Sequence, residues 1–182
     1  MKVGHRINAR KVVLSYFYQR CFFHNLSKQD NNVSTILSVD NIFSSQKEQF
    51  EEAKSELMLK IKNELEISDD ENLEYFVNIF FDKRPVGEID MDYVFAVGKS
   101  FEKYFDEAIE NINKHTQSFS FSEMNTMNQT LFLLGYVEWK VLQTPKEVLL
   151  NELIELAKRY DDEGSPKLIN GIMHKVFNNI QE

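Results

Sequence analysis

The sequence has few residues that interrupt helices and almost none that cross-link a chain. Its 182 residues include six glycines, three prolines and a single cysteine, Cys21. One cysteine excludes an internal disulfide and a cysteine-rich zinc site, so nothing in the sequence requires an oxidising compartment. The scarcity of glycine and proline, together with 42% apolar and 27% charged residues, favours an all-α globular protein.

Long apolar runs and catalytic motifs are also missing. No apolar run approaches the roughly 18 residues that a membrane-spanning helix needs, and the N-terminus lacks the apolar segment of a signal peptide. We therefore expect a cytoplasmic protein with no membrane contact. The four histidines have no metal-binding spacing, and glycine-rich phosphate-binding loops are absent. The sequence predicts no enzyme, no cofactor and no metal site.

Acidic residues are absent from the first 25 positions, although the whole chain has a net charge of −8. This segment carries five basic residues: Lys2, Arg6, Arg10, Lys11 and Arg20. A basic end on an acidic body attracts a polyanion to that end. Cations in the first turn of a helix also oppose its dipole, at a cost of about 0.3 kcal/mol or more each, which a bound polyanion would relieve. The alternative is a solvated first turn.

The spacing of apolar residues predicts helices over about 6–23, 90–115, 120–142, 145–160 and 165–177. Before the second of these, a polar stretch at about 27–45 resembles a linker. Two further amphipathic helices follow it, at about 50–65 and 73–81. We interpret 26–88 as an inserted helical hairpin that covers part of the core, with a docking element for another protein as the alternative.

Capping signals mark the starts of two of these helices. Thr144, followed by Pro145 and Glu147, has the pattern of a capping box, and Ser120 with Glu123 has the same pattern. In the last helix we interpret Gly171 as a position of close helix approach, where a larger side chain would disturb the fold.

The last two helices resemble those of the NusB transcription antitermination factors. That family carries a proline, then V-x-I-N-E-A-x-E-L-A-K-x-F/Y, a short turn, and S-x-K-F-V-N-G-V-L-x-K. Here the matching positions are Pro145, Val148, Leu150-Asn151-Glu152-Leu153, Glu155-Leu156-Ala157-Lys158, Tyr160, Ser165, Lys167-Leu168-Ile169-Asn170-Gly171-Ile172-Met173 and Lys175. The order, the polarity and the gap between the helices all agree.

The N-terminus also resembles the family, whose first helix opens with R-x-x-A-R and ends near L-Y-Q. Arg6, Ala9 and Arg10, then Tyr18-Gln19, hold those places. The resemblance implies a NusB-like bundle of about seven helices forming one domain over 1–182. Its two closely packed subdomains would be 1–118, including the insertion, and 119–182.

The resemblance further implies a transcription antitermination factor. Such a protein binds boxA-like single-stranded RNA together with the ribosomal protein NusE and acts on elongating RNA polymerase during rRNA transcription. The residues expected at the RNA are Lys2, Arg6, Arg10, Lys11, Tyr18, Ser165 and Lys167, with Tyr16 an alternative to Tyr18 for base stacking. We expect Arg6 and Arg10 at an exposed first turn, so that their removal leaves stability nearly unchanged. A helical interaction module or homodimer without RNA binding is the alternative.

The resemblance is weakest over residues 125–137. The family has charged residues and then L-R-x-A-x-Y-E, whereas Asn125 to Asn128 are uncharged here and Phe132 stands where the arginine would be. Contacts between this segment and NusE therefore cannot be assigned from the resemblance.

Overall fold

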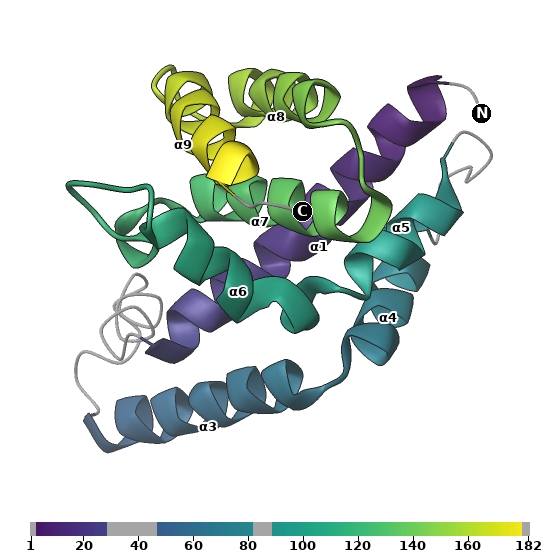
Figure 1. Cartoon of the computed structure of the whole chain (residues 1–182). Helices are drawn as coiled ribbons and strands as arrows, with labels where there is room; N and C mark the ends of the chain where they lie inside the picture. The colour runs from purple at the N-terminus through teal and green to yellow at the C-terminus, as the bar shows by residue number, and fades with distance from the viewer. Residues whose placement is uncertain (1–2, 29–46, 82–88, 180–182) are drawn as a thin grey trace.

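The computed structural model of the chain describes residues 3–28, 47–81 and 89–179. This part contains eight α-helices, one 3-10 turn and no strand (Figure 1). The elements are α1 (Val3–Lys28), α3 (Lys47–Glu66), α4 (Asp69–Phe81), α5 (Met91–Gly98), α6 (Phe101–Asn113), the turn η1 (Phe121–Glu123), α7 (Thr126–Leu142), α8 (Lys146–Tyr160) and α9 (Ser165–Asn179). The all-α prediction is confirmed.

Helix α7 lies at the centre of the bundle. It contacts α1, α5, α6, α8 and α9, and every residue from Asn128 to Trp139 is buried. A helix enclosed on all sides must be apolar around most of its circumference, as the segment Leu131–Tyr136 is. Phe132, which replaces the arginine of the family pattern, is fully buried. The departure from the family pattern in this part of α7 therefore belongs to the core.

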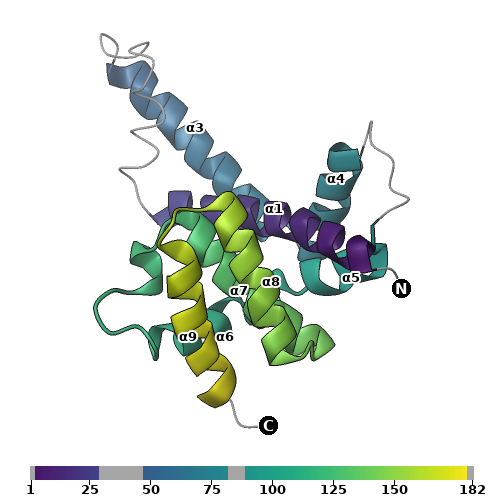
Figure 2. The ribbon, with the colours of Figure 1, turned by 90° about the horizontal axis from the view of Figure 1, so that it is seen from above.

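Helices α8 and α9 form an antiparallel pair joined by residues 161–164. Figure 1 shows both above α7, and Figure 2 shows them side by side. Gly135 of α7 permits a close approach, because a Cβ built there would lie 2.4 Å from Leu153 Cδ1 and 3.0 Å from Met173 Cε. Gly171 is different. It faces outward, and a Cβ there would meet nothing within 4 Å, so the expected close approach at Gly171 is wrong.

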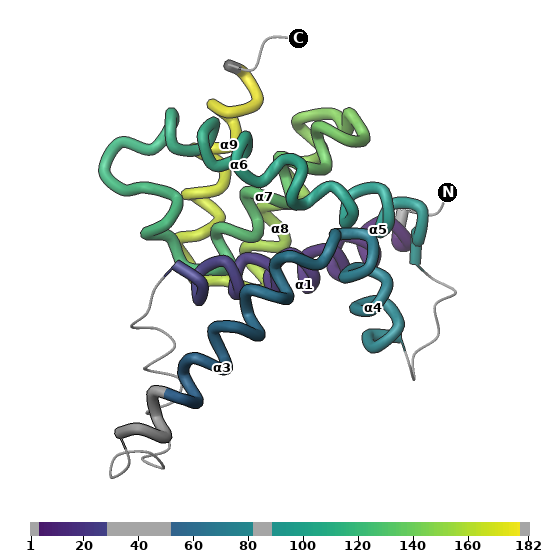
Figure 3. The backbone as a smooth tube through the Cα atoms, turned by 90° about the horizontal axis from the view of Figure 1, so that it is seen from below, coloured from purple at the N-terminus to yellow at the C-terminus, as the bar shows by residue number. Residues whose placement is uncertain are grey.

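Helices α3 and α4 occupy the described part of the predicted insertion; residues 29–46 and 82–88 lie outside the described residues. Helix α3 packs on the far end of α1 through Ile61 and Leu26, and α4 packs on α5 near Gly98 through Leu73. Figures 2 and 3 show the two helices diverging from their junction, so they form an open pair. Each helix covers a different part of the bundle.

The helix predicted over 90–115 is divided into α5 and α6. The hydroxyl of Ser100 donates to the Ala96 carbonyl (3.1 Å), and the Ser100 N–H donates to Val97 O (3.1 Å), which ends the α5 hydrogen-bond ladder. Asp69 of α4 then accepts the first-turn N–H of Glu102 at 2.7 Å, as a capping side chain would. The acceptor comes from a distant part of the chain, so the local sequence does not reveal the break.

Neither predicted capping box begins an α-helix in the structure. The Ser120–Glu123 capping box forms, but it closes the 3-10 turn, and α7 begins later with Asn125 as N-cap, whose Oδ1 accepts from Asn128 N at 2.7 Å. Thr144 does not cap α8; its hydroxyl donates to Glu138 Oε1 at 3.0 Å. A buried carboxylate is a stronger acceptor than solvent, so tertiary contact replaced the local cap.

Candidate nucleic-acid interface

The guanidinium of Arg10 lies inside the protein between α1, α7 and α8. Its Nε donates to Glu138 Oε2 at 2.9 Å and its Nη2 to Glu138 Oε1 at 2.7 Å, while Nη1 donates to Glu152 Oε2 at 3.0 Å. This two-pronged geometry is the strong form of an arginine–carboxylate pair. Only 6% of the Arg10 side chain and none of the Glu138 side chain is exposed.

Glu138 is the centre of a polar cluster that links four segments. Besides Arg10, it accepts from the hydroxyls of Tyr93 on α5 (2.6 Å) and Thr144 (3.0 Å), so its charge is well compensated. Burial alone would lower the pKa of Arg10, but the hydrogen bonds and charge of Glu138 outweigh burial and raise it. Burial is the larger cause that raises the pKa of Tyr93 well above its ordinary value, and the adjacent charge of Glu138 raises this pKa further. Arg10 thus remains charged and Tyr93 neutral at physiological pH.

These contacts correct the expectation that Arg6 and Arg10 lie at an exposed first turn. Arg10 is buried, and its guanidinium already binds two carboxylates. Arg6 is half-buried: its Nε donates to Asp90 Oδ2 at 2.9 Å and its guanidinium lies 4.7 Å from the centre of the Tyr93 ring. The carboxylates that neutralise both arginines lie more than 80 residues away in the sequence.

Lys11, by contrast, keeps its ammonium at the surface beside the C-terminal half of α8. Its nearest described partner is neutral Asn8, at 3.4 Å from Nζ to Oδ1. With Lys158 and Arg159 it borders a hollow of about 300 Å³ between α1 and α8, which is lined by Ile7, Lys11, Glu152, Glu155, Leu156, Lys158 and Arg159. Lys158 pairs with Glu155 at 2.6 Å. In the described part of the chain, neither Lys11 nor Arg159 has a carboxylate within salt-bridge distance.

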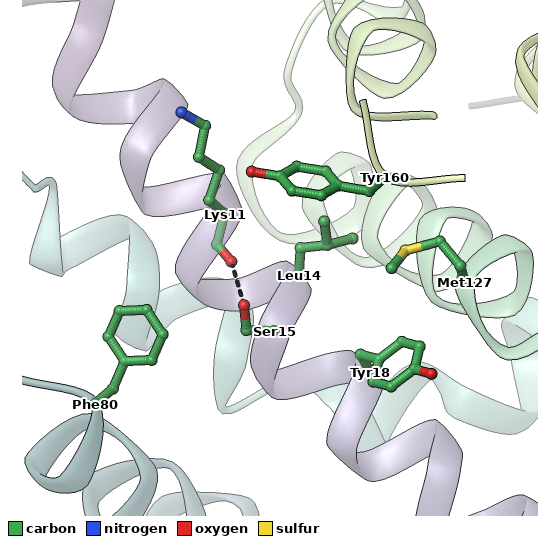
Figure 4. A pocket seen from close by; sticks show the side chains of 7 residues that line it. All are labelled: Lys11, Leu14, Ser15, Tyr18, Phe80, Met127 and Tyr160. Carbon is green, nitrogen blue, oxygen red and sulfur yellow. Dashed lines mark hydrogen bonds between the residues drawn. The ribbon is translucent and has the colours of Figure 1, made fainter. Parts of the chain in front are cut away.

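A second, more apolar groove of about 420 Å³ lies on the other side of Lys11. It is lined by Lys11, Leu14, Ser15, Tyr18, Phe80, Met127 and Tyr160. Figure 4 shows α1 running between Phe80 of α4 and the pair Met127 and Tyr160. Tyr18 is 39% exposed and Tyr160 40% exposed, so both rings offer surface to a ligand. We call this cavity the tyrosine groove.

The remaining sequence-predicted residues occupy different environments. Lys2 lies outside the described residues. Tyr16 is fully buried, and its hydroxyl donates to Asp69 at 3.1 Å, so this tyrosine belongs to the core and cannot stack on a base. Tyr18 is therefore the member of the pair that can. Burial, then the Asp69 charge, raises the pKa of Tyr16, which stays neutral.

Ser165 and Lys167 lie at the start of α9, but only Lys167 is exposed. The Ser165 hydroxyl donates to Asn128 Oδ1 at 2.6 Å, and its N–H donates to Asp162 Oδ1 at 3.0 Å. The Gly164 N–H also donates to Asp162 Oδ1, at 2.9 Å. A carboxylate of the same chain therefore already binds the Ser165 N–H, which is not free to bind an anion.

Sequence reasoning missed Tyr160 and Arg159 as site residues. Tyr160 holds the F/Y position of the family pattern at the end of α8, where it was interpreted only as part of a helix. Arg159, whose guanidinium lies 5.5 Å from the centre of the Tyr160 ring, is not among the residues that the sequence predicts at the RNA. The sequence signal that could have identified them is an aromatic residue next to a cation at the end of a helix. Only the tertiary structure, which places α8 beside α1, brings Arg159 and Tyr160 to Lys11.

Comparison with known proteins decides the family. The model of the NusB family matches residues 51–178. The chain belongs to the NusB family. The matched region includes most of α3 and all of α4 through α8, so much of the predicted insertion lies within it. Helix α1 lies outside the matched region. Assignments on α1 thus depend on its own residues and geometry.

Individual NusB-family relatives match shorter parts of the chain. A protein of Campylobacter concisus named transcription antitermination protein NusB is 37% identical over 67 residues, which are 37% of this chain and 51% of the relative. Proteins of the same name are 26% identical over 101 residues in Aliarcobacter butzleri (56% of this chain, 77% of the relative) and 32% identical over 91 residues in Clostridium botulinum (50% and 64%). The chain therefore spans about half the length of the Campylobacter relative.

Two features are absent from the residues that the structure describes in this NusB-family member. No group of three or more histidine, cysteine, aspartate or glutamate side chains is arranged to hold a metal ion. No described helix has both the length and the apolar character needed to cross a membrane.

Proposed function

We propose that this NusB-family member is an RNA-binding transcription antitermination factor without catalytic activity. Two findings support the proposal: the family membership and the names of its relatives. The main structural support is the tyrosine groove, which places two exposed aromatic rings beside Lys11, a cation with no carboxylate partner among the described residues. Proteins recognise single-stranded RNA through this combination of stacking surface and positive charge.

The ligand of the groove would be a boxA-like single-stranded RNA. In this arrangement Tyr18 and Tyr160 stack on unpaired bases, and Lys11 and Arg159 neutralise the adjacent phosphates. Lys167 adds a more distant charge. Arg10 contributes indirectly, because it pairs with Glu152 in the neighbouring hollow between α1 and α8 and so reduces the repulsion that a phosphate near Lys11 would meet.

NusE and the elongating RNA polymerase are the proposed protein partners, and rRNA transcription the proposed setting. If the RNA contacts both proteins at once, NusE supplies further contacts. One shallow groove with few free cations on this chain is then sufficient for RNA binding. Titration of the protein with a boxA-like RNA, alone and with NusE at low salt, tests the proposal. Tighter binding with NusE is expected, and absence of binding under both conditions would overturn it.

The same titration distinguishes the alternative of an interaction module or homodimer. Self-association in sizing experiments, with no RNA bound and no NusE recovered in a pull-down, would favour that alternative.

A further inference from the structure

The outer face of α4 exposes two large apolar side chains away from the tyrosine groove. Tyr75 is 68% exposed and Ile79 60% exposed. They lie four residues apart and so share one face of the helix, and Glu71 continues the row one turn earlier. We call Glu71, Tyr75 and Ile79 the α4 row. Figures 2 and 3 show that α4 projects from the bundle, which makes this row accessible to another molecule.

A hollow of about 320 Å³ lies at the base of the row, where α3 meets α4. It is lined by Glu64, Ile67, Glu71, Asn72 and Tyr75. Two side chains hold the wall in place: Arg20 Nη1 donates to the Glu64 carbonyl at 2.9 Å, and Asn72 Nδ2 donates to the same oxygen at 3.2 Å. The Arg20 side chain is fully buried, so the junction is anchored in the core.

The charge around this hollow is uncompensated. Glu64 and Glu71 have no salt-bridge partner among the residues that the structure describes. On another side of α4, Lys99 neutralises Asp70 at 2.7 Å and lies 3.8 Å from Glu74. The negative charge of α4 is therefore left unpaired beside the exposed ring of Tyr75.

We propose that the α4 row binds a protein segment that inserts an arginine into the hollow and covers Ile79 with an apolar side chain. The two glutamates match the charge of a guanidinium, and the Tyr75 ring offers it a stacking surface. Ile67 packs against the aliphatic stem. The same carboxylates repel phosphate, so this face selects a basic protein rather than RNA. The proposal does not depend on RNA binding at the tyrosine groove.

The test uses a short, end-blocked peptide of alternating arginine and leucine, titrated into isotope-labelled full-length protein and followed by NMR. The signals of the Ile79 methyls and the Tyr75 ring should shift, and a peptide with lysine in place of arginine should bind more weakly because ammonium stacks less well. A peptide with glutamate in those places should not bind. Shifts spread over all acidic surfaces, or equal binding of the glutamate peptide, would overturn the proposal.

Matched variants locate the site. Replacing Glu64 and Glu71 together by Gln should weaken arginine-peptide binding about tenfold, because two exposed ion pairs with the guanidinium are lost. The thermal melt should change little, because neither carboxylate has a salt-bridge partner in the described structure and their effects on the helix dipoles oppose each other: Glu71 lies in the first turn of α4 and Glu64 in the last turn of α3. Glu56→Gln is the charge control, because Glu56 already pairs with Lys60 at 2.6 Å. An equal loss of affinity in the control would contradict the site.

Two further variants test the proposed apolar contact at Ile79. Ile79→Ala should weaken binding of the arginine–leucine peptide. Leu59→Ala should not, because Leu59 is equally exposed, at 59%, but lies on α3 outside the α4 row. If Ile79→Ala left the affinity unchanged, the peptide would be held by charge alone and the proposed docking mode would be wrong.

Discussion

Arg10 and Glu138 form a two-pronged ion pair, with Nε–Oε2 at 2.9 Å and Nη2–Oε1 at 2.7 Å, that connects α1 to the central helix α7. The two residues are 128 positions apart in the sequence. Because the pair is enclosed, its loss affects the fold before it affects any ligand. This relationship changes what substitution of the N-terminal arginines is expected to do.

Arg10→Ala should lower the free energy of unfolding by about 3–5 kcal/mol, because it leaves a buried carboxylate without its partner. Urea denaturation measures the loss. Arg6→Ala is the control: its side chain is 23% exposed and pairs with Asp90, so a loss of about 1 kcal/mol is expected. Equal losses from both variants would contradict the distinction between them.

Lys11→Ala combined with Arg159→Ala should weaken RNA binding with little change in stability. The slope of log affinity against log salt should flatten by about 1.4, at about 0.7 for each phosphate contact on a single strand. Filter binding at several salt concentrations measures the slope. Lys60→Ala, an exposed cation on α3, serves as the matched charge control. An unchanged slope in the double variant would show that these cations are solvated surface charges.

Tyr18→Ala and Tyr160→Ala should each reduce RNA affinity about tenfold, because a stacked base contributes about 1–3 kcal/mol. Tyr18→Phe keeps the ring and should retain most of the affinity. Fluorescence anisotropy with a labelled boxA-like RNA measures all three. If Tyr18→Phe lost as much affinity as Tyr18→Ala, the contribution would come from the hydroxyl group and stacking would not be its origin.

Two glycines should respond to alanine with opposite signs. Gly171→Ala should stabilise the protein by about 0.5–1 kcal/mol, because the new Cβ meets nothing and alanine favours a helix. Gly135→Ala should cost about 1–3 kcal/mol through overpacking against the fully buried Leu153. Thermal melts of the two variants give the signs, and stabilisation by both would contradict the close packing of α7 on α8.

The stability of the protein at acid pH should depend on Glu102. Burial alone would raise its pKa, but hydrogen bonds from His24 (3.0 Å) and Arg20 (2.6 Å) outweigh burial and hold the pKa below the ordinary 4.5. The pKa of such a carboxylate is lower in the folded protein than in the unfolded chain. The ionised carboxylate therefore stabilises the fold at any pH above the unfolded-state pKa, and this stabilisation is lost as the pH falls through the folded-state pKa. Burial raises the pKa of Asp69, whose contribution has the opposite sign.

Comparison of Glu102→Gln with the unmodified protein isolates the Glu102 contribution. The variant should lose less stability between about pH 5 and pH 3, measured by urea midpoints at each pH. Glu155→Gln, which removes an exposed ion pair with Lys158, should leave the pH dependence nearly unaltered. Parallel curves for the unmodified protein and Glu102→Gln would refute the assignment.

Local patterns were sufficient to predict most of the helices. Few helix breakers and apolar residues at helical spacing predicted α8 and α9 almost to their ends, and the Asn-Glu and Asn-Gly patterns identified the family. Helix α7 was predicted despite an apolar character on all sides, because Met127, Leu131, Leu134 and Val137 recur at helical spacing. These features depend on residues close in sequence, whose spacing fixes which side of a helix is apolar.

Composition and periodicity are properties of neighbouring residues, so they were enough to predict an all-α NusB-family protein with an acid-free N-terminal segment. Which cations are available to a ligand depends on contacts between distant parts of the chain. Arg10 became buried when α7 and α8 brought Glu138 and Glu152 to it. Lys11, next to it in the sequence, lies about 100° further around α1 and borders the groove instead. The same long-range packing separated α5 from α6 through Asp69 and brought Tyr160 beside Lys11 and Tyr18. The carboxylate partners of Arg6 and Arg10 lie 84 to 142 residues away and leave no local pattern, so only the tertiary fold shows which cations reach the site.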